Sequence, residues 1–170
     1  MFDIEISLKP NKKNLAFIDD MLNRLHMVNV GVFAKEEKRK WKRSQHTKLW
    51  HPSEKDTLIG VAHRHEFGLG VPQRSFLRAT YHKKLRPIRF RLRVGFEKAI
   101  KKRQIRYVSA GFIVAGRYAA AQVQRRFFLG DFKALSPKTR PDDEFRQPLW
   151  DTAQLAHSID YEYLNMRKLN

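Results

Sequence analysis

Three groups of side chains in this sequence have types and spacings that could support chemistry. The first is His63-x-His65-Glu66, in which two imidazoles and a carboxylate could bind a metal ion. The spacing differs from the His-Glu-x-x-His of zinc proteases, because Leu69 stands where the second histidine would follow. We therefore interpret the two histidines as structural or surface residues rather than as metal ligands.

The second group is the acidic run Asp142-Asp143-Glu144, which could hold magnesium beside a phosphate. No acid-x-Lys nuclease pattern follows it, and acidic runs in loops are usually solvated. The third group, Gly68-x-Gly70, is too short for a phosphate loop, and Pro72 follows it instead of a helix start with Lys and Ser/Thr. No nucleophile elbow or catalytic triad is recognisable. We predict that the protein is not an enzyme and uses neither a metal nor another cofactor.

Composition limits the class of protein. The 170 residues fit a single domain, residues 1–170, and Lys and Arg outnumber Asp and Glu by 35 to 17, for a net charge of +18. Such an excess predicts polyanionic or acidic partners. Cysteine is absent, and no apolar run approaches the roughly 20 residues of a membrane span. We expect a soluble protein without membrane contact, made in the cytoplasm of its cell.

The first third of the chain alternates between predicted strands and a helix. Residues 2–8 alternate between apolar and polar types and predict a strand. Asn14 is a candidate N-cap for a helix whose apolar face holds Leu15, Ile18, Leu22 and Leu25. Residues 27–33 are rich in β-branched types and predict a second strand.

Residues 35–56 form a basic segment without helical or strand periodicity, which predicts a long loop or protruding arm. One interpretation is a solvated insertion. The other is an arm that becomes ordered against a partner, with Trp41 and Trp50 as its anchors.

Three helices are predicted in the middle of the chain. The first covers residues 57–65, with Asp56 or Thr57 as its cap, and ends at the glycines 68 and 70. The second has apolar residues every three or four positions from Leu77 to Ile100, and Pro87 predicts a kink or a break within it. The third covers residues 109–129, where glycines 111 and 116 allow a close neighbour.

The second of these helices is strongly basic. Its predicted outer face and the residues just after it carry cations, with Glu97 as the opposing acid: Lys83, Lys84, Arg86, Arg89, Arg91, Arg93, Lys98, Lys101, Lys102, Arg103 and Arg106. Phe90, Phe96 and Tyr107 are interleaved with them. Such a face could contact nucleic-acid phosphates without reading sequence, meet acidic protein, or simply be solvated.

The C-terminal stretch 148–159 reads Pro-Leu-Trp-Asp-Thr-Ala-Gln-Leu-Ala-His-Ser-Ile. Asp151 or Thr152 is a candidate cap for a short helical turn. Apolar and acidic residues then alternate from Ile159 to Tyr163, which predicts a strand. Strands, then helices, then a strand predict an α+β fold: a small, mostly antiparallel sheet packed against long helices.

Two motifs in the sequence resemble those of the neck and tail-completion proteins of long-tailed bacteriophages. One is the C-terminal stretch, which matches Pro-Leu-x-Asp-Thr-Gly-x-Leu-x-x-Ser-Ile at Pro148, Leu149, Asp151, Thr152, Leu155, Ser158 and Ile159. The other matches Asn-Glu-Phe-Gly, a short loop and Pro-x-Arg-Pro-Phe-Leu-Arg at Glu66, Phe67, Gly68, Pro72, Arg74, Phe76, Leu77 and Arg78.

The chain departs from these motifs at three positions. His65 replaces the Asn and Ser75 the second Pro, and Ala153 stands where the family usually has Gly, so this turn is expected to form without a positive φ. We expect Phe67 and Phe76 to be core residues, and Arg74 to order the loop or meet a neighbour.

The resemblance implies a structural virion protein. Family members form rings, typically hexamers, between the head connector and the tail tube, and DNA passes through the ring. They include head-side adaptors, tail terminators and joining pieces. A head-to-tail ring needs two complementary patches. The basic segment 83–106 is one candidate, and the acidic residues Asp142, Asp143, Glu144, Asp151, Asp160 and Glu162 are the other. The alternative is a sequence-independent nucleic-acid-binding protein that uses the same basic segment.

Overall fold

The computed structural model describes residues 12–33, 57–129, 132 and 153–167. These residues form two compact units. Unit 1 takes the described residues within Met1–Asn29, Lys84–Tyr118 and Tyr161–Asn170, and unit 2 takes those within Val30–Lys83 and Ala119–Asp160. Each unit is described by itself below.

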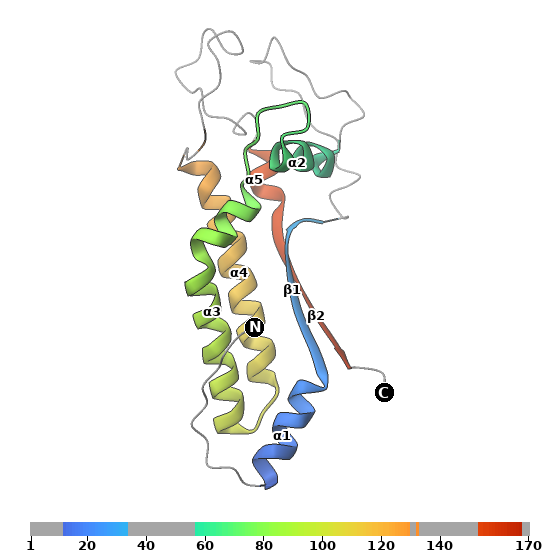
Figure 1. Ribbon diagram of the computed structural model, residues 1–170, viewed down its shortest axis with the longest axis vertical. Helices are drawn as coiled ribbons and strands as arrows, with labels where there is room; N and C mark the ends of the chain where they lie inside the picture. Colours follow the sequence, from blue (N-terminus) through green and yellow to red (C-terminus); the bar gives the residue numbers. More distant parts are fainter. Residues whose placement is uncertain (1–11, 34–56, 130–131, 133–152, 168–170) are drawn as a thin grey trace. The chain divides into compact units, whose positions relative to one another are not determined.

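The fold is α+β, which confirms the predicted class. A two-stranded antiparallel sheet packs against long helices (Figure 1). In chain order the elements are α1 (Lys12–Leu22), β1 (Arg24–Val32), α2 (Leu58–Phe67), α3 (Leu77–Lys102), α4 (Arg106–Phe128), α5 (Gln154–Ser158) and β2 (Ile159–Arg167). Within the described part of the chain, none of the helices has the length and apolar character that crossing a bilayer requires.

Several predicted features lie outside the described residues. They are the strand at 2–8, the basic arm at 35–56 with Trp41 and Trp50, the acidic run Asp142-Asp143-Glu144, and the first half of the C-terminal motif, Pro148, Leu149, Asp151 and Thr152.

The predicted apolar face of the first helix is wrong. Leu15 and Leu22 are 51% and 61% exposed, whereas Met21 is buried and Phe17 packs beside it. The helix ends at Leu22, so Leu25 belongs to β1 and not to the helical face. The spacing of apolar residues in α1 allows more than one side of the helix to face the core. Packing against Ala99, Ile100 and Val108 makes Met21 the buried residue.

The core of unit 1 lies between α1, the C-terminal part of α3 and the start of α4. Its buried members are Met21, Ala99, Ile100 and Val108, with Phe96 and Phe112 packed against them. The Tyr163 hydroxyl on β2 donates a hydrogen bond to Ser109 Oγ on α4 at 2.8 Å. The same hydroxyl lies 2.7 Å from His26 Nδ1 on β1. This hydrogen-bonded chain joins β1, β2 and α4.

In unit 1, the backbones of α3 and α4 come close together at Gly95 and Gly111. A Cβ atom added to Gly95 would lie 2.7 Å from Gly111 Cα and 2.9 Å from the Tyr107 carbonyl oxygen. Gly116 faces the sheet in the same way, because its added Cβ would collide with Val28 Cγ2. The close approach predicted for Gly111 and Gly116 is therefore present.

Of the two alternatives predicted at Pro87, the break is wrong, because α3 is continuous from Leu77 to Lys102, and the kink stays a prediction. A proline removes only one ladder bond, and the turns on either side continue the helix. The guanidinium of Arg91 also donates from Nη1 to the Pro87 carbonyl at 2.8 Å. Ile88 and Ile100 of the predicted stripe are buried, but Tyr81 is half exposed.

The core of unit 2 is built around two aromatic rings. Phe76 and Phe127 are fully buried, with ring centroids 5.0 Å apart. α2 packs against α5 (Figure 1). Leu58 and Val61 are buried on α2, and Leu155 on α5.

The N-cap of α5 is Ala153, and not the predicted Asp151 or Thr152. Ala153 adopts φ 52° and ψ 5°, the left-handed conformation. The expectation that this turn forms without a positive φ is therefore wrong. Ala153 therefore adopts the left-handed backbone conformation that glycine adopts without strain. For a residue with a Cβ atom, this conformation is less stable than the right-handed one by roughly 1–2 kcal/mol.

We predict that Ala153→Gly stabilises the protein. Glycine removes the left-handed strain at the cost of some backbone entropy, so the expected gain in the free energy of unfolding is about 0.5–1 kcal/mol. Urea denaturation followed by circular dichroism measures it. Ala156→Gly, at a buried helical position of α5, is the matched control and should lose about 1 kcal/mol. A loss in both variants would contradict the strain at Ala153.

We predict that Gly95→Ala destabilises the protein by about 1–3 kcal/mol, because the added methyl group meets backbone atoms of α4 that cannot rotate away. Gly60→Ala on α2 is the control. The nearest atom to its added Cβ is Thr57 Oγ1 at 3.5 Å, so this change should be neutral or stabilising. Thermal unfolding of both variants tests the pair. Equal midpoints would show that the helices do not depend on the glycine contact.

Candidate functional site

The carboxylate of Glu66 ties the end of α2 to the start of α3. Glu66 is only 3% exposed. Its Oε2 accepts hydrogen bonds from the backbone N–H groups of Phe76 at 2.8 Å and Leu77 at 2.9 Å. Its Oε1 accepts from the Ser75 hydroxyl at 2.8 Å, and from Arg78 N at 3.1 Å and Nε at 3.0 Å. Glu66 therefore acts as the N-terminal cap of a helix that lies later in the chain.

This arrangement follows from the needs of a helix start. The first N–H groups of a helix have no partner within the helix, and a negative charge there also interacts favourably with the helix dipole. Burial by itself raises the pKa of Glu66, but the hydrogen bonds from Leu77, Ser75 and Arg78 outweigh it and leave the pKa below its ordinary value. Glu66 is thus held as an anion.

The loop between α2 and α3 is shaped by the residues of the first motif. Gly68 ends α2 with φ 74°, and its N–H donates to the Arg64 carbonyl at 2.7 Å. Gln73 Nε2 donates to the Glu66 carbonyl at 3.2 Å. Arg74 N donates to the His65 carbonyl at 2.8 Å. Thr57, one of the two predicted caps, accepts from Gly60 N at the other end of α2.

The structure separates the two phenylalanines of this motif. Phe76 is in the core, as predicted, but Phe67 is 48% exposed and the prediction for it is wrong. Phe67 contacts the His63 ring, at 4.8 Å between centroids, and the Arg78 guanidinium lies 4.6 Å from its ring centre. The turn at Gly68 directs the chain away from the core immediately after Phe67. Pro72 is exposed in the loop.

Arg74 is buried beside His65. Its Nη1 lies 3.3 Å from His65 Nδ1. Burial, together with the charges of Arg74 and Arg64, lowers the pKa of His65 to about 4, so this imidazole is neutral at pH 7. A neutral imidazole can accept a hydrogen bond from the guanidinium. Arg74 therefore orders the loop, which was one of its two predicted roles.

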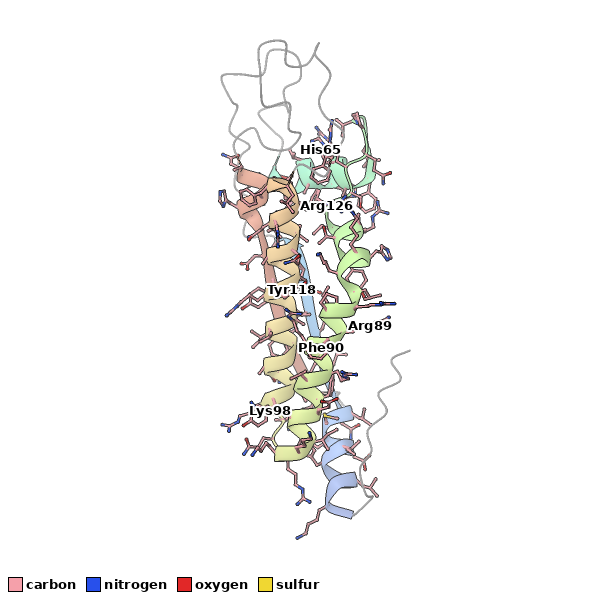
Figure 2. The ribbon with its side chains drawn as sticks, turned by 90° about the vertical axis from the view of Figure 1, so that its left-hand side faces the viewer. His65, Arg89, Phe90, Lys98, Tyr118 and Arg126 are labelled. Atoms are coloured by element: carbon pink, nitrogen blue, oxygen red, sulfur yellow. The ribbon has the colours of Figure 1, made fainter. Side chains whose placement is uncertain are left out.

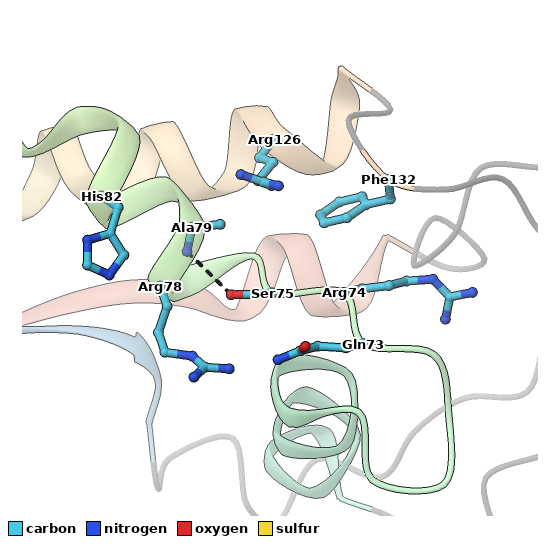
Figure 3. A pocket seen from close by; sticks show the side chains of 8 residues that line it. All are labelled: Gln73, Arg74, Ser75, Arg78, Ala79, His82, Arg126 and Phe132. Atoms are coloured by element: carbon cyan, nitrogen blue, oxygen red, sulfur yellow. Dashed lines mark hydrogen bonds between the residues drawn. The ribbon is translucent and has the colours of Figure 1, made fainter.

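An open pocket of about 430 Å³ lies at this loop. Figure 3 shows its lining, which comes from the loop, the first turns of α3 and the end of α4. Three of the lining side chains are arginines: Arg74, Arg78 and Arg126. Phe132 lies against Arg126, with the guanidinium 5.1 Å from its ring centre.

The second candidate surface belongs to unit 1. Residues of α3 spaced three or four apart place several exposed side chains on one side of the helix, and we call this set the basic face: Arg86, Arg89, Phe90, Arg93 and Lys101. Phe90 is 56% exposed, and the Arg93 guanidinium lies 5.5 Å from its ring centre. Figure 2 shows Arg89 and Phe90 on α3.

Other cations of the predicted set lie elsewhere on the helix. Arg91 is half-buried, with its guanidinium 3.6 Å from the centre of the Tyr118 ring. Lys84 is half-buried as well, and Lys83, at an exposed position, belongs to unit 2. Lys102 and Arg103 are exposed at the C-terminal end of α3.

In the second motif, Leu155, Ser158 and Ile159 are buried. The Ser158 hydroxyl donates to the Leu155 carbonyl at 2.8 Å, and Gln124 Nε2 on α4 donates to the Ile159 carbonyl at 2.9 Å. Because α5 packs on α2, the first motif and the described half of the second both belong to the core of unit 2. The acidic run 142–144 is outside the described residues, so its meeting with the basic face stays a prediction.

Sequence reasoning missed Arg126, His82 and Phe132 as pocket residues, and the chain from His26 through Tyr163 to Ser109. These residues lie far apart in sequence, and no local pattern connects them. Among the described residues, no cluster of three or more His, Cys, Asp or Glu side chains is arranged to hold a metal ion. Comparison with family models, with curated proteins and with solved structures found no match to this chain.

We predict that Glu66→Gln destabilises the protein by about 3 kcal/mol at pH 7, because an amide cannot replace the anion that accepts the α3 N–H groups. The depressed pKa fixes the pH dependence. The stabilisation is complete above the ordinary value of 4.5 and is lost as pH falls through the lower folded-state pKa. Urea denaturation at several pH values should therefore show wild type and variant converging in acid.

Glu97→Gln is the control for this measurement. Glu97 forms an exposed pair with Arg93 at 3.4 Å on the same helix, and such a pair contributes at most about 0.5 kcal/mol. An equal effect of the two substitutions would show that Glu66 does not act as a buried cap.

Proposed function

We propose that this protein is a structural component of a tailed-phage virion that forms a ring at the neck and joins the head connector to the tail tube. The observation that carries the proposal is that both motifs of the resemblance belong to one packed unit. Glu66, Phe76 and Arg78 of the first motif interact directly, and α5 of the second motif packs on α2. This supports interpreting the two motifs as parts of one structural feature.

The basic face supplies a surface for contact between subunits. Two large apolar side chains of α3 are exposed among its charges or next to them in the sequence, namely Phe90 and Val94. An exposed aromatic ring next to an arginine is typical of residues that contribute most to protein interfaces.

A closed head-to-tail ring needs a second, different patch that is complementary to the first. The acidic run Asp142-Asp143-Glu144 is the proposed partner of the basic face on the neighbouring subunit. Charge complementarity of this kind sets register and partner choice more than affinity. Cations outside the interface would then face DNA in the lumen, and the hexamer of the resembled family is the expected ring.

Sequence-independent binding of DNA is the second candidate function. The observation that favours it is the same exposed ring with guanidinium neighbours, because bases stack on aromatic side chains while arginines contact phosphates. In this case the acidic run has no role in binding.

A charge-exchange experiment separates the two functions. Variant A carries Arg86→Glu, Arg89→Glu and Arg93→Glu; variant B carries Asp142→Lys, Asp143→Lys and Glu144→Lys. We predict that nuclease-treated wild type self-associates, that A or B alone does not, and that an equimolar mixture does. In the mixture every interface again joins opposite charges. Light scattering coupled to size-exclusion chromatography measures the mass, and negative-stain microscopy shows whether rings form.

The DNA-binding function gives a different pattern. The wild-type protein would stay monomeric without nucleic acid, variant A would lose affinity for duplex DNA, and variant B would keep or increase it. A mixture of A and B that remains monomeric, while wild type associates, would contradict the proposed pairing of the two patches.

A further inference from the structure

The turn between α3 and α4 gathers positive charge around one aromatic ring. Lys98 Nζ lies 4.8 Å from the centre of the Tyr107 ring, and the Arg106 guanidinium lies 5.2 Å from the same centre. Arg106 Nη2 also donates a hydrogen bond to the Tyr107 hydroxyl at 3.4 Å. Lys102 follows Lys98 by about one helical turn, and both are exposed on α3, where Figure 2 labels Lys98. We call Lys98, Lys102 and Arg106 the turn cluster.

The phenol of Tyr107 reports that these cations act on one place. The hydrogen bond from Arg106 lowers the pKa of Tyr107, and the charges of Arg106, Lys98 and Lys102 act in the same direction, whereas burial acts against them. From Lys98 to Gly130 the sequence contains no Asp or Glu. The turn and the whole of α4 therefore carry no acidic residue of their own to offset the cluster.

The stability of the helices explains only part of this charge. Lys102 lies at the C-terminal end of α3, where a cation interacts favourably with the helix dipole. Arg106 begins α4, where a cation is unfavourable, and no acidic residue occupies the first turn of that helix. The charge of Arg106 thus opposes the helix that it begins, and an anionic partner at the turn would relieve this.

The exposure of the cluster indicates what kind of anion fits it. A single small anion would bind weakly, because exposed charges are screened by water and salt. Duplex DNA presents closely spaced phosphates and releases condensed counterions when cations contact them, a gain that carboxylates on a folded protein do not offer. Cations already lie over the Tyr107 ring, so contact with phosphates is expected rather than stacking with a base.

We propose that the turn cluster binds backbone phosphates of duplex DNA without reading sequence, which leaves the basic face for contacts between subunits. This deepens the proposed function and rests on it for the presence of DNA beside the chain. Arg89 and Lys102 are thirteen positions apart on α3, which is about 20 Å along the helix axis. Because screening acts within about 8 Å at physiological salt, the two surfaces can be tested separately.

The test measures the binding of the full chain to short fluorescent DNA duplexes by anisotropy, over a series of salt concentrations. The turn variant carries Lys98→Gln, Lys102→Gln and Arg106→Gln. We expect wild type to bind two duplexes of unrelated sequence equally. The turn variant should bind both more weakly, and its slope of log affinity against log salt should be about three units shallower, since each lost phosphate contact removes nearly one unit.

A single substitution repeats the test with the least structural change. Arg106→Gln should make the slope about one unit shallower. Its thermal midpoint should equal or exceed that of wild type, because the substitution removes an unfavourable charge from the start of α4. Weaker DNA binding by this variant would therefore not be a consequence of unfolding.

The matched control removes the same number of charges from the basic face, by Arg86→Gln, Arg89→Gln and Arg93→Gln. It should keep the wild-type salt slope, whereas DNA binding through the basic face predicts the larger loss in this control. An equal loss in both triple variants, a larger loss in the control, or no binding of wild type to DNA would overturn the proposal. A polyglutamate competitor of matched charge should displace less duplex than unlabelled DNA does. Equal displacement would assign the turn to an acidic protein and would also overturn it.

Failure of the ring gives a different result from failure of the turn cluster. Light scattering of nuclease-treated protein measures self-association without DNA, and the turn variant should associate as wild type does. A monomeric wild type whose salt slope depends on the turn cluster would contradict the ring and support the cluster. An associating wild type whose salt slope does not depend on the cluster would do the opposite.

Discussion

Much of unit 2 depends on one carboxylate. Glu66 is the last acidic residue before the α2–α3 loop, and its two oxygens bind the N–H groups that begin the next helix. Through the backbone of Phe76, this cap also fixes the ring that fills the centre of the core. The side chain that caps the helix therefore also positions the core, and the short loop between them has little freedom left.

The arginines of this chain differ in how much solvent surrounds their charge. On the basic face, Arg86, Arg89 and Arg93 are exposed, so their fields are screened by salt within about 10 Å at ordinary ionic strength. Arg74 is buried, where screening is weak and the compensation must come from atoms in direct contact. The net charge of +18 does not reveal this difference, because it counts both kinds of arginine equally.

The sequence predicted those parts of the fold that local rules determine. Thr57 caps α2 and Gly68 ends it because hydroxyl caps and left-handed glycines act within one turn. The sequence-based prediction failed where contacts between residues far apart in the chain determine which side chain is buried. Leu15 and Met21 are both apolar, and only the packing of α1 shows which is buried. Glu66 was recognised in a motif, but its role as a cap needs residues 75–78, and the pocket needs Arg126 from the far end of α4.

The sequence separation of the contacts sets an order for folding. The Glu66 cap closes a loop of nine to twelve residues, which is a small entropic cost, so α2, the loop and the start of α3 can form early. The contact between His26 and Tyr163 joins positions 137 residues apart. High contact order slows folding, and among the described residues the partner strand of β1 is β2, which is synthesised last. Until β2 has been made, the edge of β1 that β2 covers is open to pairing with other chains.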